Sequence, residues 1–294
     1  MRQVIAAALF LLVTIPVFGW GQKGHYLSNE AATYGTPSEM PGFFHRAYPQ
    51  LVYLSYDPDR WRDSKGKSLD ALNPPDHFLD YEYVEHLELP PQRYKFIQLL
   101  SDSGTLRRFS IESTTPGFLP WRIAEMCELL EVQWRLWRQR DLPPEERQQV
   151  EANIIQLAGT LGHYVADAAN PHHASIHYNG WVGWPNTNRF PNDCDTHNRF
   201  ETQFVSRVME SGQILPRMSE PKLRSEYFNT ALGFIRSSVS LIDPMYRMDR
   251  DGGFRARKGT ADSRAFTATR LAAGASLLRD LWWSTYRNSA PKVP

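Results

Sequence analysis

Apolar side chains recur at helical spacing along much of the chain, and the clearest case lies near its middle. Within residues 144–160 the apolar positions follow one buried helical face: Val150, Ile154, Leu157 and Ala158. Residues 120–140 show the same pattern, with tryptophans on the apolar face, and Pro143 and Pro144 separate the two segments. The pattern predicts two long antiparallel helices as the scaffold.

Other segments carry shorter or weaker helical patterns. These predict helices from His25 to about Ala32 and at 41–54, 94–100, 221–241 and 261–287. The last two contain no histidine and are expected to serve packing. Segments 56–63 and 73–80 are predicted as loops, the second because it contains Pro74 and Pro75.

The first 19 residues have the pattern of a secretory signal. Arg2 precedes an uncharged apolar run over 4–18, and Gly19 supplies a small residue just before Trp20. The run is too short for a membrane span, and no later stretch is apolar enough to be one. We expect cleavage before Trp20 and an exported protein, secreted or periplasmic, without a transmembrane anchor.

The charge composition argues against one class of function, the charge-driven binding of nucleic acid. Removing Arg2 with the signal turns 33 basic and 32 acidic residues into 32 of each. A neutral chain without a long basic run is not expected to bind duplex nucleic acid through charge. Without a linker, repeat or low-complexity tract, residues 20–294 suit one large domain or two small ones, and we expect one.

Two cysteines, Cys127 and Cys194, follow the signal. They could form one disulfide in an oxidising compartment, although the sequence does not show that they meet. They are too few for a thiolate zinc site. Any metal must therefore be held by histidine and carboxylate side chains.

The run LGHYVADAANPHH, residues 161–173, contains the highest density of potential metal ligands and catalytic groups in the chain. His163 and Asp167 are four apart at the end of a predicted helix, so they share one face. Pro171 ends that helix, which lets His173 turn back toward the pair. Taken singly, His163 could be a core histidine, Asp167 a solvated carboxylate and the two final histidines part of a turn. Taken together, these residues favour metal binding.

The expected start of the mature chain, WGQKGH, offers two more donors. Cleavage would give Trp20 a free amino group, whose pKa is low enough for a neutral nitrogen ligand. His25 follows five residues later, and two glycines let the backbone fold back between them. The alternative is a buried tryptophan with no role in metal binding.

A histidine and an aspartate are expected from the segments 56–63 and 73–80. His77 follows two prolines and precedes an apolar pair, which suits a residue that points inward, although an ordinary loop histidine is the alternative. Among Asp57, Asp59 and Asp63 we favour Asp59 as a ligand, because it lies between a proline and an Arg/Trp pair. The other two remain open.

A second pair four apart lies at His197 and Glu201, in a helix with Asp195 or Thr196 as its N-cap. Such pairs also occur on solvated helix faces. The preceding loop carries three aromatic residues that we expect to edge the site and contact substrate: Trp181, Trp184 and Phe190. They could stack a nucleobase or lie at a lipid interface, and packing is the alternative.

The candidate ligands form one set of nitrogen and oxygen donors, suited to zinc: the Trp20 terminus, His25, Asp59, His77, His163, Asp167, His173, His197 and Glu201. The set contains more donor groups than one zinc ion binds. A cluster of two or three is the natural interpretation.

Together, WGxxGH, DHFLD, HYVADAANPHH and HxxxE resemble the zinc-dependent phospholipase C family of bacteria and the related single-strand-specific nucleases of fungi and plants. The HxxxDxxxxxH motif of that family matches His163, Asp167 and His173 without a gap. The resemblance spans residues 20–201 and implies an all-α fold of the multi-helix bundle type.

The resemblance also implies three zinc ions. One is held by Asp59, His77, His163 and Asp167. A second is held by His173, His197 and Glu201. The third is held by the amino nitrogen and carbonyl of Trp20 with His25, and it shares Asp167.

The implied activity is hydrolysis of a phosphate ester by a zinc-bound hydroxide, with Asp59 orienting or deprotonating the water. WGxxGH and the long loop before His197 resemble the nucleases, whereas Glu201 resembles the phospholipases. We expect a monomeric phospholipase C-like phosphodiesterase that acts on a phospholipid head group. The alternatives are a single-strand-specific nuclease or 3'-nucleotidase, acting on single-stranded nucleic acid or nucleotides, and an exported zinc-binding protein without turnover.

Overall fold

The computed structural model describes residues 20–62 and 66–291. The predicted signal over 1–19 and the alternative ligand Asp63 lie outside these ranges. The described residues form helices and connecting segments with no strand, so the all-α prediction is confirmed. Within these ranges no helix is both long and apolar enough to cross a bilayer.

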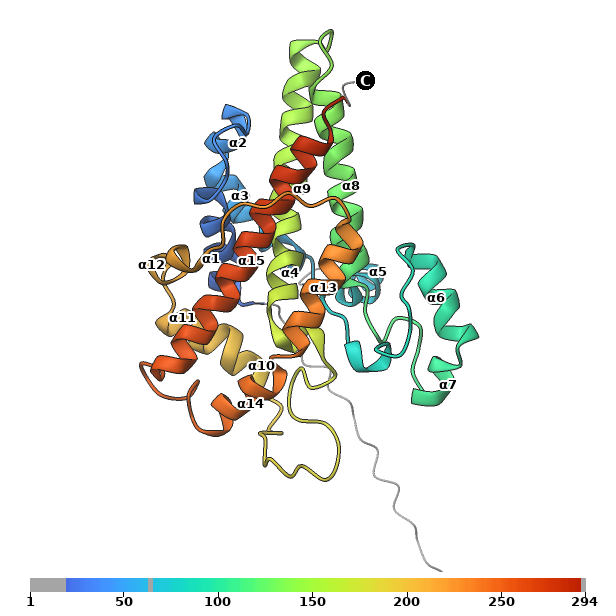
Figure 1. The fold of residues 1–294 in the computed structure, drawn as a ribbon, viewed down its shortest axis with the longest axis vertical. Helices are drawn as coiled ribbons and strands as arrows, with labels where there is room; N and C mark the ends of the chain where they lie inside the picture. The colour runs from blue at the N-terminus through green and yellow to red at the C-terminus, as the bar shows by residue number, and fades with distance from the viewer. Residues whose placement is uncertain (1–19, 63–65, 292–294) are drawn as a thin grey trace, which may run out of the picture.

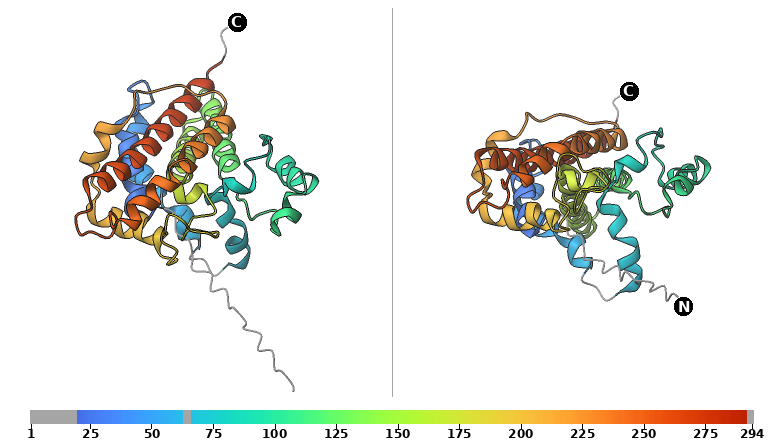
Figure 2. Two further views of the ribbon diagram at one scale, coloured as in Figure 1. Left: turned by 60° about the horizontal axis from the view of Figure 1, so that its bottom comes forward. Right: turned by 90° about the horizontal axis from the view of Figure 1, so that it is seen from below.

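Two antiparallel helices form the centre of the fold, as predicted (Figure 1). They are α8, Leu119–Trp137, and α9, Pro144–Ala169. Against them pack α15, Ala261–Asn288, and α13, Tyr227–Val239, while α1, Gln22–Tyr34, packs on both α9 and α15. Figure 2 shows α6 and α7 standing to one side of this bundle. The lower end of α9 in Figure 1, where its ligand residues lie, is surrounded by chain segments from both halves of the sequence.

The remaining helices are short, and most connect the long ones: α2 Gly42–Arg46, α3 Tyr48–Leu54, α4 Asp57–Arg62, α5 Lys67–Leu72, η1 Pro74–His77, η2 Tyr81–Tyr83, α6 Arg93–Asp102, α7 Thr105–Phe109, η3 Pro171–Ala174, α10 Thr196–Asn198, η4 Arg199–Phe204, α11 Val205–Val208, α12 Ser211–Ile214, η5 Leu215–Arg217 and α14 Ile242–Arg250. Of these, η4 is a π-helix.

Small residues on α9 let its neighbours approach closely. A Cβ added at Gly159 would lie 2.6 Å from the Cβ of Leu54, and one at Gly162 would lie 2.1 Å from Oδ1 of Asn29. The Asn29 amide then donates to the carbonyls of Leu51, at 2.9 Å, and Gly159, at 3.3 Å. One buried side chain of α1 therefore fastens α3 and α9 together, which sets the distance between the histidines of α1 and α9.

Two predictions about local structure differ from the structure, and a third is made more specific by it. The helix predicted at 41–54 is two, because Pro49 lacks an amide hydrogen and is tolerated only in the first turn of α3. The loop predicted at 56–63 contains α4, whose first turn carries Asp57 and Asp59, acids that favour a helix start. The segment 73–80 begins with the 3₁₀ turn η1, consistent with the exclusion of regular α-helix there.

The helix predicted from 221 begins only at Tyr227. The chain before it runs along α15, and its backbone amides donate to side chains of that helix. Ser219 donates to Ser276 Oγ at 3.0 Å, and Lys222 donates to Asp280 Oδ1 at 3.0 Å. These donors are therefore taken by tertiary contacts rather than by an additional helical turn.

The two cysteines do not form a disulfide. Cys127 is buried in α8, whereas Cys194 is exposed in the loop before α10, and both are free. Burial raises the pKa of the Cys127 thiol well above its usual value.

Distant side chains cap the C-terminal end of α9. The carbonyl of Ala166 accepts from the Trp20 indole at 2.7 Å, and that of Ala169 accepts from Arg270 Nε at 2.8 Å. Between them, the carbonyl of Ala168 accepts from Ser238 Oγ at 2.6 Å. A buried helix end needs such partners, because its last carbonyls have none within the helix. The end of α9 is consequently held from three directions.

Ser238 provides a test of this cap. Replacing it by alanine would leave the Ala168 carbonyl and Arg270 Nη2, which donates to Ser238 Oγ at 3.0 Å, without that hydroxyl. We expect Ser238→Ala to lower the free energy of unfolding in urea by about 1–3 kcal/mol. Ser237→Ala, at an exposed position of the same helix, is the control and should change it by less than about 0.5 kcal/mol. Equal effects would contradict the assigned role of Ser238.

Candidate metal centre

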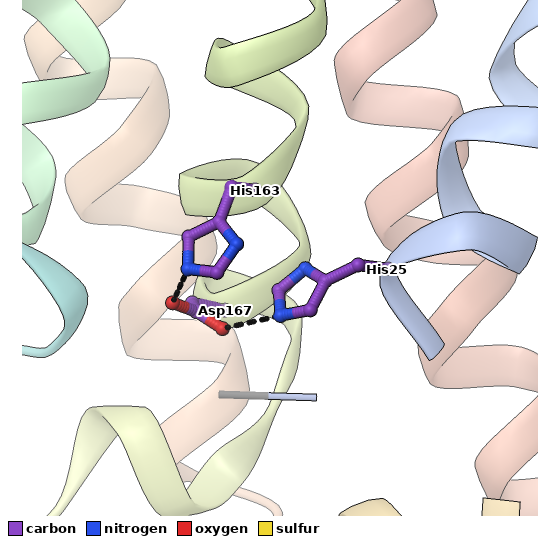
Figure 3. A group of neighbouring side chains, drawn as sticks. All are labelled: His25, His163 and Asp167. Carbon is purple, nitrogen blue, oxygen red and sulfur yellow. Dashed lines mark ion pairs between the residues drawn. The ribbon is translucent and has the colours of Figure 1, made fainter. Parts of the chain in front are cut away.

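Asp167 lies at the centre of a buried group of ligand-type side chains (Figure 3). Its Oδ1 is 3.6 Å from His25 Nε2, and its Oδ2 is 3.3 Å from His163 Nε2. The rings of His25 and His163 are stacked, with centroids 4.0 Å apart. All three side chains are fully buried. The carboxylate therefore faces one histidine of α1 with one oxygen and one histidine of α9 with the other.

His77 and Asp59 complete the α9 side of this group. His77 Nδ1 lies 2.9 Å from His163 Nε2 and 3.1 Å from Asp167 Oδ2, and Asp59 Oδ1 lies 3.9 Å from His163 Nε2. Ligand atoms of Asp59, His77 and His163 all lie within 4.8 Å of one another, so these residues could hold one metal ion. Asp57, the other described candidate on α4, instead pairs with Arg60 at 2.5 Å.

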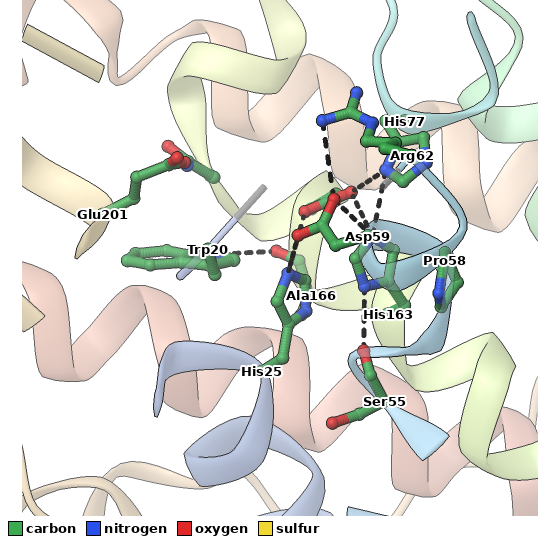
Figure 4. Close-up of polar contacts among 12 residues, drawn as sticks. Trp20, His25, Ser55, Pro58, Asp59, Arg62, His77, His163, Ala166 and Glu201 are labelled. Atoms are coloured by element: carbon green, nitrogen blue, oxygen red, sulfur yellow. Dashed lines mark hydrogen bonds and ion pairs between the residues drawn. The ribbon is translucent and has the colours of Figure 1, made fainter. Parts of the chain in front are cut away.

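The start of the described chain reaches the same carboxylate. Trp20 is fully buried, and its backbone amide donates a hydrogen bond to Asp167. Its indole ring packs on Phe200, with centroids 5.1 Å apart, and its Nε1 donates to the Ala166 carbonyl (Figure 4). A second possible metal group is His25, His163 and Asp167. The backbone nitrogen of Trp20 borders this group, where the sequence predicts an amino ligand.

The third possible group lies after the end of α9. His197 Nε2 is 2.6 Å from Glu201 Oε2 and 3.1 Å from His173 Nε2, and His173 Nε2 is 3.6 Å from Glu201 Oε2. All three residues are buried. His197 lies on α10 and Glu201 on the π-helix η4. The two side chains are in contact, as their spacing of four residues predicts. Asp195 occupies the N-cap position, but its side chain makes no capping hydrogen bond.

Backbone carbonyls and one amide orient these ligands. His163 Nδ1 donates to the Ser55 carbonyl at 2.8 Å, and His173 Nδ1 donates to the His77 carbonyl at 2.7 Å. Each contact directs the other ring nitrogen, Nε2, into the cluster as a lone-pair donor. Asn170, just past the end of α9, donates from Nδ2 to Glu201 Oε2 at 3.2 Å. No spacing in the sequence predicted this contact, although Asn170 stands directly before Pro171.

Burial sets the protonation of the cluster. Loss of water lowers the pKa of His163 to about 4, against the opposite effect of the Asp59 carboxylate, and raises the pKa of Asp167 to about 6. The same cause lowers the pKa of His25 and His197 well below the usual value and raises that of Glu201 well above it. Neutral imidazoles are the form that binds metal ions.

Several of these buried atoms lack a hydrogen-bond partner among the described residues. They are both ring nitrogens of His25, Nε2 of His77 and Oδ1 of Asp167. A buried polar atom without a partner costs about 1–3 kcal/mol, and more when it is charged. A cation beside Asp167 would supply a partner for its Oδ1 and for His25 Nε2, which lie 3.6 Å apart. The donor set of imidazoles and carboxylates fits zinc, which takes nitrogen and oxygen ligands in this combination.

Arg62 adds a cation at the edge of the cluster. Its side chain is mostly buried at the end of α4, and its Nη1 lies 3.5 Å from Asp59 Oδ1. Its Nε and Nη1 have no hydrogen-bond partner among the described residues. A guanidinium with unused donors beside a cationic centre suits an anionic group such as a phosphate. Its signal in the sequence is an arginine three residues after Asp59, which became meaningful only when the segment proved helical.

The loop between the two ligand segments forms an aromatic cluster. Trp181 stacks on His177, with ring centroids 3.8 Å apart, and its edge meets Phe190 at 4.6 Å. Phe190 is buried against Tyr246, which favours packing over substrate contact for this ring. Trp184, by contrast, is 92% exposed. Of the three expected substrate residues, Trp184 is the one whose ring is free to meet a ligand.

No protein-family model matches the chain, and no curated protein matches it. Among solved structures, it is similar to the alpha-toxin from Clostridium absonum, with 12% identity, a TM-score of 0.44 and coverage of 94% of this chain and 68% of the toxin chain. It is also similar to the alpha-toxin of Clostridium perfringens isolated from avian strain SWCP, with 14% identity and a TM-score of 0.44. That match covers 92% of this chain and 64% of the toxin chain, so the chain spans less than two thirds of this second toxin.

Proposed function

We propose that this protein is a zinc-dependent hydrolase of phosphoric esters with three metal ions. The observation that carries the proposal is the buried carboxylate of Asp167, which faces His25 on one side and His77 and His163 on the other. The separate group around His197 provides a further place for a cation. Imidazole and carboxylate donors without a thiolate are also the ligand set of catalytic zinc sites, in which the protein ligands leave one position for water or substrate.

The ligand assignment follows the three groups. Asp59, His77, His163 and Asp167 would hold the first ion, and His173, His197 and Glu201 would hold the second. His25 and Asp167 would hold the third with the amino nitrogen and carbonyl of a cleaved Trp20. Zinc held in this way supplies Lewis acidity, which lowers the pKa of bound water to about 7 and neutralises charge on phosphoryl oxygens.

The protein side chains contribute three further effects. Asp59 orients the attacking water and accepts its proton, since it lies beside the cluster and borders Arg62. Arg62 binds a phosphate oxygen through its Nε, which has no hydrogen-bond partner among the described residues, while its Nη1 faces Asp59. The carbonyls of Ser55 and His77 hold His163 and His173 in fixed tautomers, which keeps the donor geometry constant during turnover.

A phospholipid is the substrate that we favour, in an exported, monomeric enzyme. Trp184 presents an exposed indole on the loop whose Tyr178 ring lies 6.3 Å from the His197 ring. An amphipathic aromatic in this place suits a lipid interface, and the neutral chain lacks the long basic run that a long nucleic acid favours. The same indole could stack a base, so single-stranded nucleic acid is the second candidate.

Substitution at Asp167 tests the shared carboxylate. Metal analysis should find about three zinc ions per wild-type chain. In Asp167→Asn the first and third ions lose a ligand, and we expect both to bind about 10- to 100-fold more weakly, with the second unaffected. Asp57→Asn is the matched control, because Asp57 pairs with Arg60 and belongs to none of the groups that could hold an ion, and it should retain all three ions. Loss of the second ion alone in Asp167→Asn would contradict the assignment.

The third ion should depend on a free chain start. A chain with one alanine in front of Trp20 carries an amide there, and an amide nitrogen is not a lone-pair donor at neutral pH. We expect this chain to bind about two zinc ions by native mass spectrometry, and the chain that starts at Trp20 to bind about three. Equal stoichiometry in the two chains would exclude Trp20 as an amino ligand.

A comparison of three substrates tests the reaction and its substrate class. We expect the zinc-loaded protein to hydrolyse short-chain phosphatidylcholine faster than single-stranded DNA. On phosphatidylcholine vesicles, Trp184→Ala should be slower by about tenfold, since loss of an interfacial ring costs on the order of 1–2 kcal/mol. On the soluble short-chain lipid it should match the wild type.

Tyr94→Ala is the control, because Tyr94 is 84% exposed on the distant helix α6. It should match the wild type on both lipids. Preferred cleavage of single-stranded DNA, lowered by Trp184→Ala, would favour the nuclease alternative. No hydrolysis of any of the three substrates by fully metal-loaded protein would contradict the proposed activity.

A further inference from the structure

In the sequence, Arg199 lies between His197 and Glu201, two of the ligands proposed for the second ion, yet its hydrogen bonds go to other residues. It is 4% exposed, and its Nε and Nη2 donate to the two carboxylate oxygens of Asp249 at 2.8 and 2.7 Å. Two parallel bonds between a guanidinium and a carboxylate fix both distance and orientation. Asp249 lies near the end of α14 and is itself buried.

The same guanidinium holds the chain that leads into the ligand turn. Its Nη1 donates to Asp195 Oδ2 at 3.2 Å, and its Nη2 donates to Asp193 Oδ1 at 3.1 Å. Asp193 also accepts from Arg255, at 3.0 Å. The arginine therefore ties together three segments: the end of the long loop, the ligand turn and α14.

The backbone that carries His197 and Glu201 is not a regular α-helix. His163 and Asp167 lie on an α-helix of 26 residues, whereas His197 and Glu201 lie in a helical run over 196–208 whose middle, Arg199–Phe204, is a π-helix between the short segments α10 and α11. A π-turn within a helix is rare and is frequently found at functional sites. Contacts from outside this run therefore help to hold His197 and Glu201 in place.

Those contacts come from more than one element. Next to the cluster, Asn170 donates to Glu201 Oε2 at 3.2 Å. From α14, the Arg199–Asp249 pair fixes the backbone of the turn. Aromatic packing adds a further contact through Phe200, whose ring centroid lies 5.7 Å from that of His172 and 5.1 Å from that of Trp20.

We propose that Arg199, acting through Asp249, is a positioning residue for the metal ion held by His173, His197 and Glu201. This role rests on the proposed metal centre. It predicts that binding of the second ion depends on the Arg199–Asp249 pair, whereas binding of the other two ions does not. Neither Arg199 nor Asp249 is a ligand of that ion in the assignment above. Their effect passes through the backbone of residues 197–201.

The test compares two arginine–aspartate pairs, in each of which the aspartate is buried. Arg199→Lys keeps the charge and loses the double contact, and Asp249→Asn keeps the shape and loses the charge. Arg224→Lys is the matched control, because Arg224 pairs with the buried Asp280 at 2.9 Å on α15, away from the ligands. Glu201→Gln, which removes a ligand, identifies the binding step that belongs to the second ion.

Each metal-free protein is titrated with Co²⁺, and the visible absorption of each binding step and the unfolding temperature are recorded. We expect Arg199→Lys and Asp249→Asn to weaken the step identified by Glu201→Gln about 10- to 100-fold, with the other two steps unchanged. Arg224→Lys should lower the unfolding temperature and leave all three steps as in the wild type.

Two results would overturn the role of Arg199. In one, its variants lower the unfolding temperature without changing the second step, so the pair serves stability alone. In the other, all three steps weaken equally. A wild-type protein that binds no ion at His173, His197 and Glu201 would contradict the proposed metal centre itself, and this failure would be visible before any variant is compared. Non-folding of Arg199→Lys, judged by circular dichroism, leaves Asp249→Asn as the deciding variant.

Discussion

The desolvation of Asp167 is the constraint on which the rest of this structure depends. A carboxylate removed from water is costly unless charges or hydrogen bonds replace the lost hydration. Here the replacements are four imidazoles and one backbone amide, and burial lowers the pKa of His25, His77, His163 and His173, which favours their neutral forms. Neutral rings do not balance the negative charge, and Arg62 contributes one positive charge near the carboxylates of Asp59 and Asp167. Further cations between the donors would stabilise the cluster, which is the physical reason to treat it as a candidate metal centre.

The fold serves this constraint by fixing one long helix and bringing the other candidate ligands to its end. Asn29 and two glycines set how closely α1 and α3 approach α9, and side chains from three distant segments cap the last carbonyls of α9. Ligands on long helices are held by this packing. Those on the turn at 197–201 are held by separate polar contacts, of which Asn170 and Arg199 are the clearest. The centre thus combines a rigid half with a half that depends on individual hydrogen bonds.

Local rules in the sequence were enough to predict part of the fold and of the site. Spacing of four brought His163 to Asp167 and His197 to Glu201, and Pro171 marked the end of α9. The all-α class and the pair α8 and α9 followed from apolar periodicity and from family resemblance. The supporting polar contacts that distant segments make with the site were not predictable. The π-turn, the chain before α13 and the partners of Arg199 arise where tertiary contacts override local preference, and no spacing in one sequence reveals which carboxylate a distant arginine will meet.

The close contact of Gly162 with Asn29 has a consequence for how this sequence can change over time. Gly162 precedes the candidate ligand His163, Asn29 follows the candidate ligand His25 by four, and a single added methyl at 162 would fall 2.1 Å from the Asn29 oxygen. A larger side chain at 162 would require the asparagine at 29 to move, and a shorter side chain at 29 would lose the amide that donates to the carbonyls of Leu51 and Gly159. Positions 29 and 162 should therefore drift as a linked pair, and a paired replacement in descendants would mark a shift in the spacing of the two ligand helices.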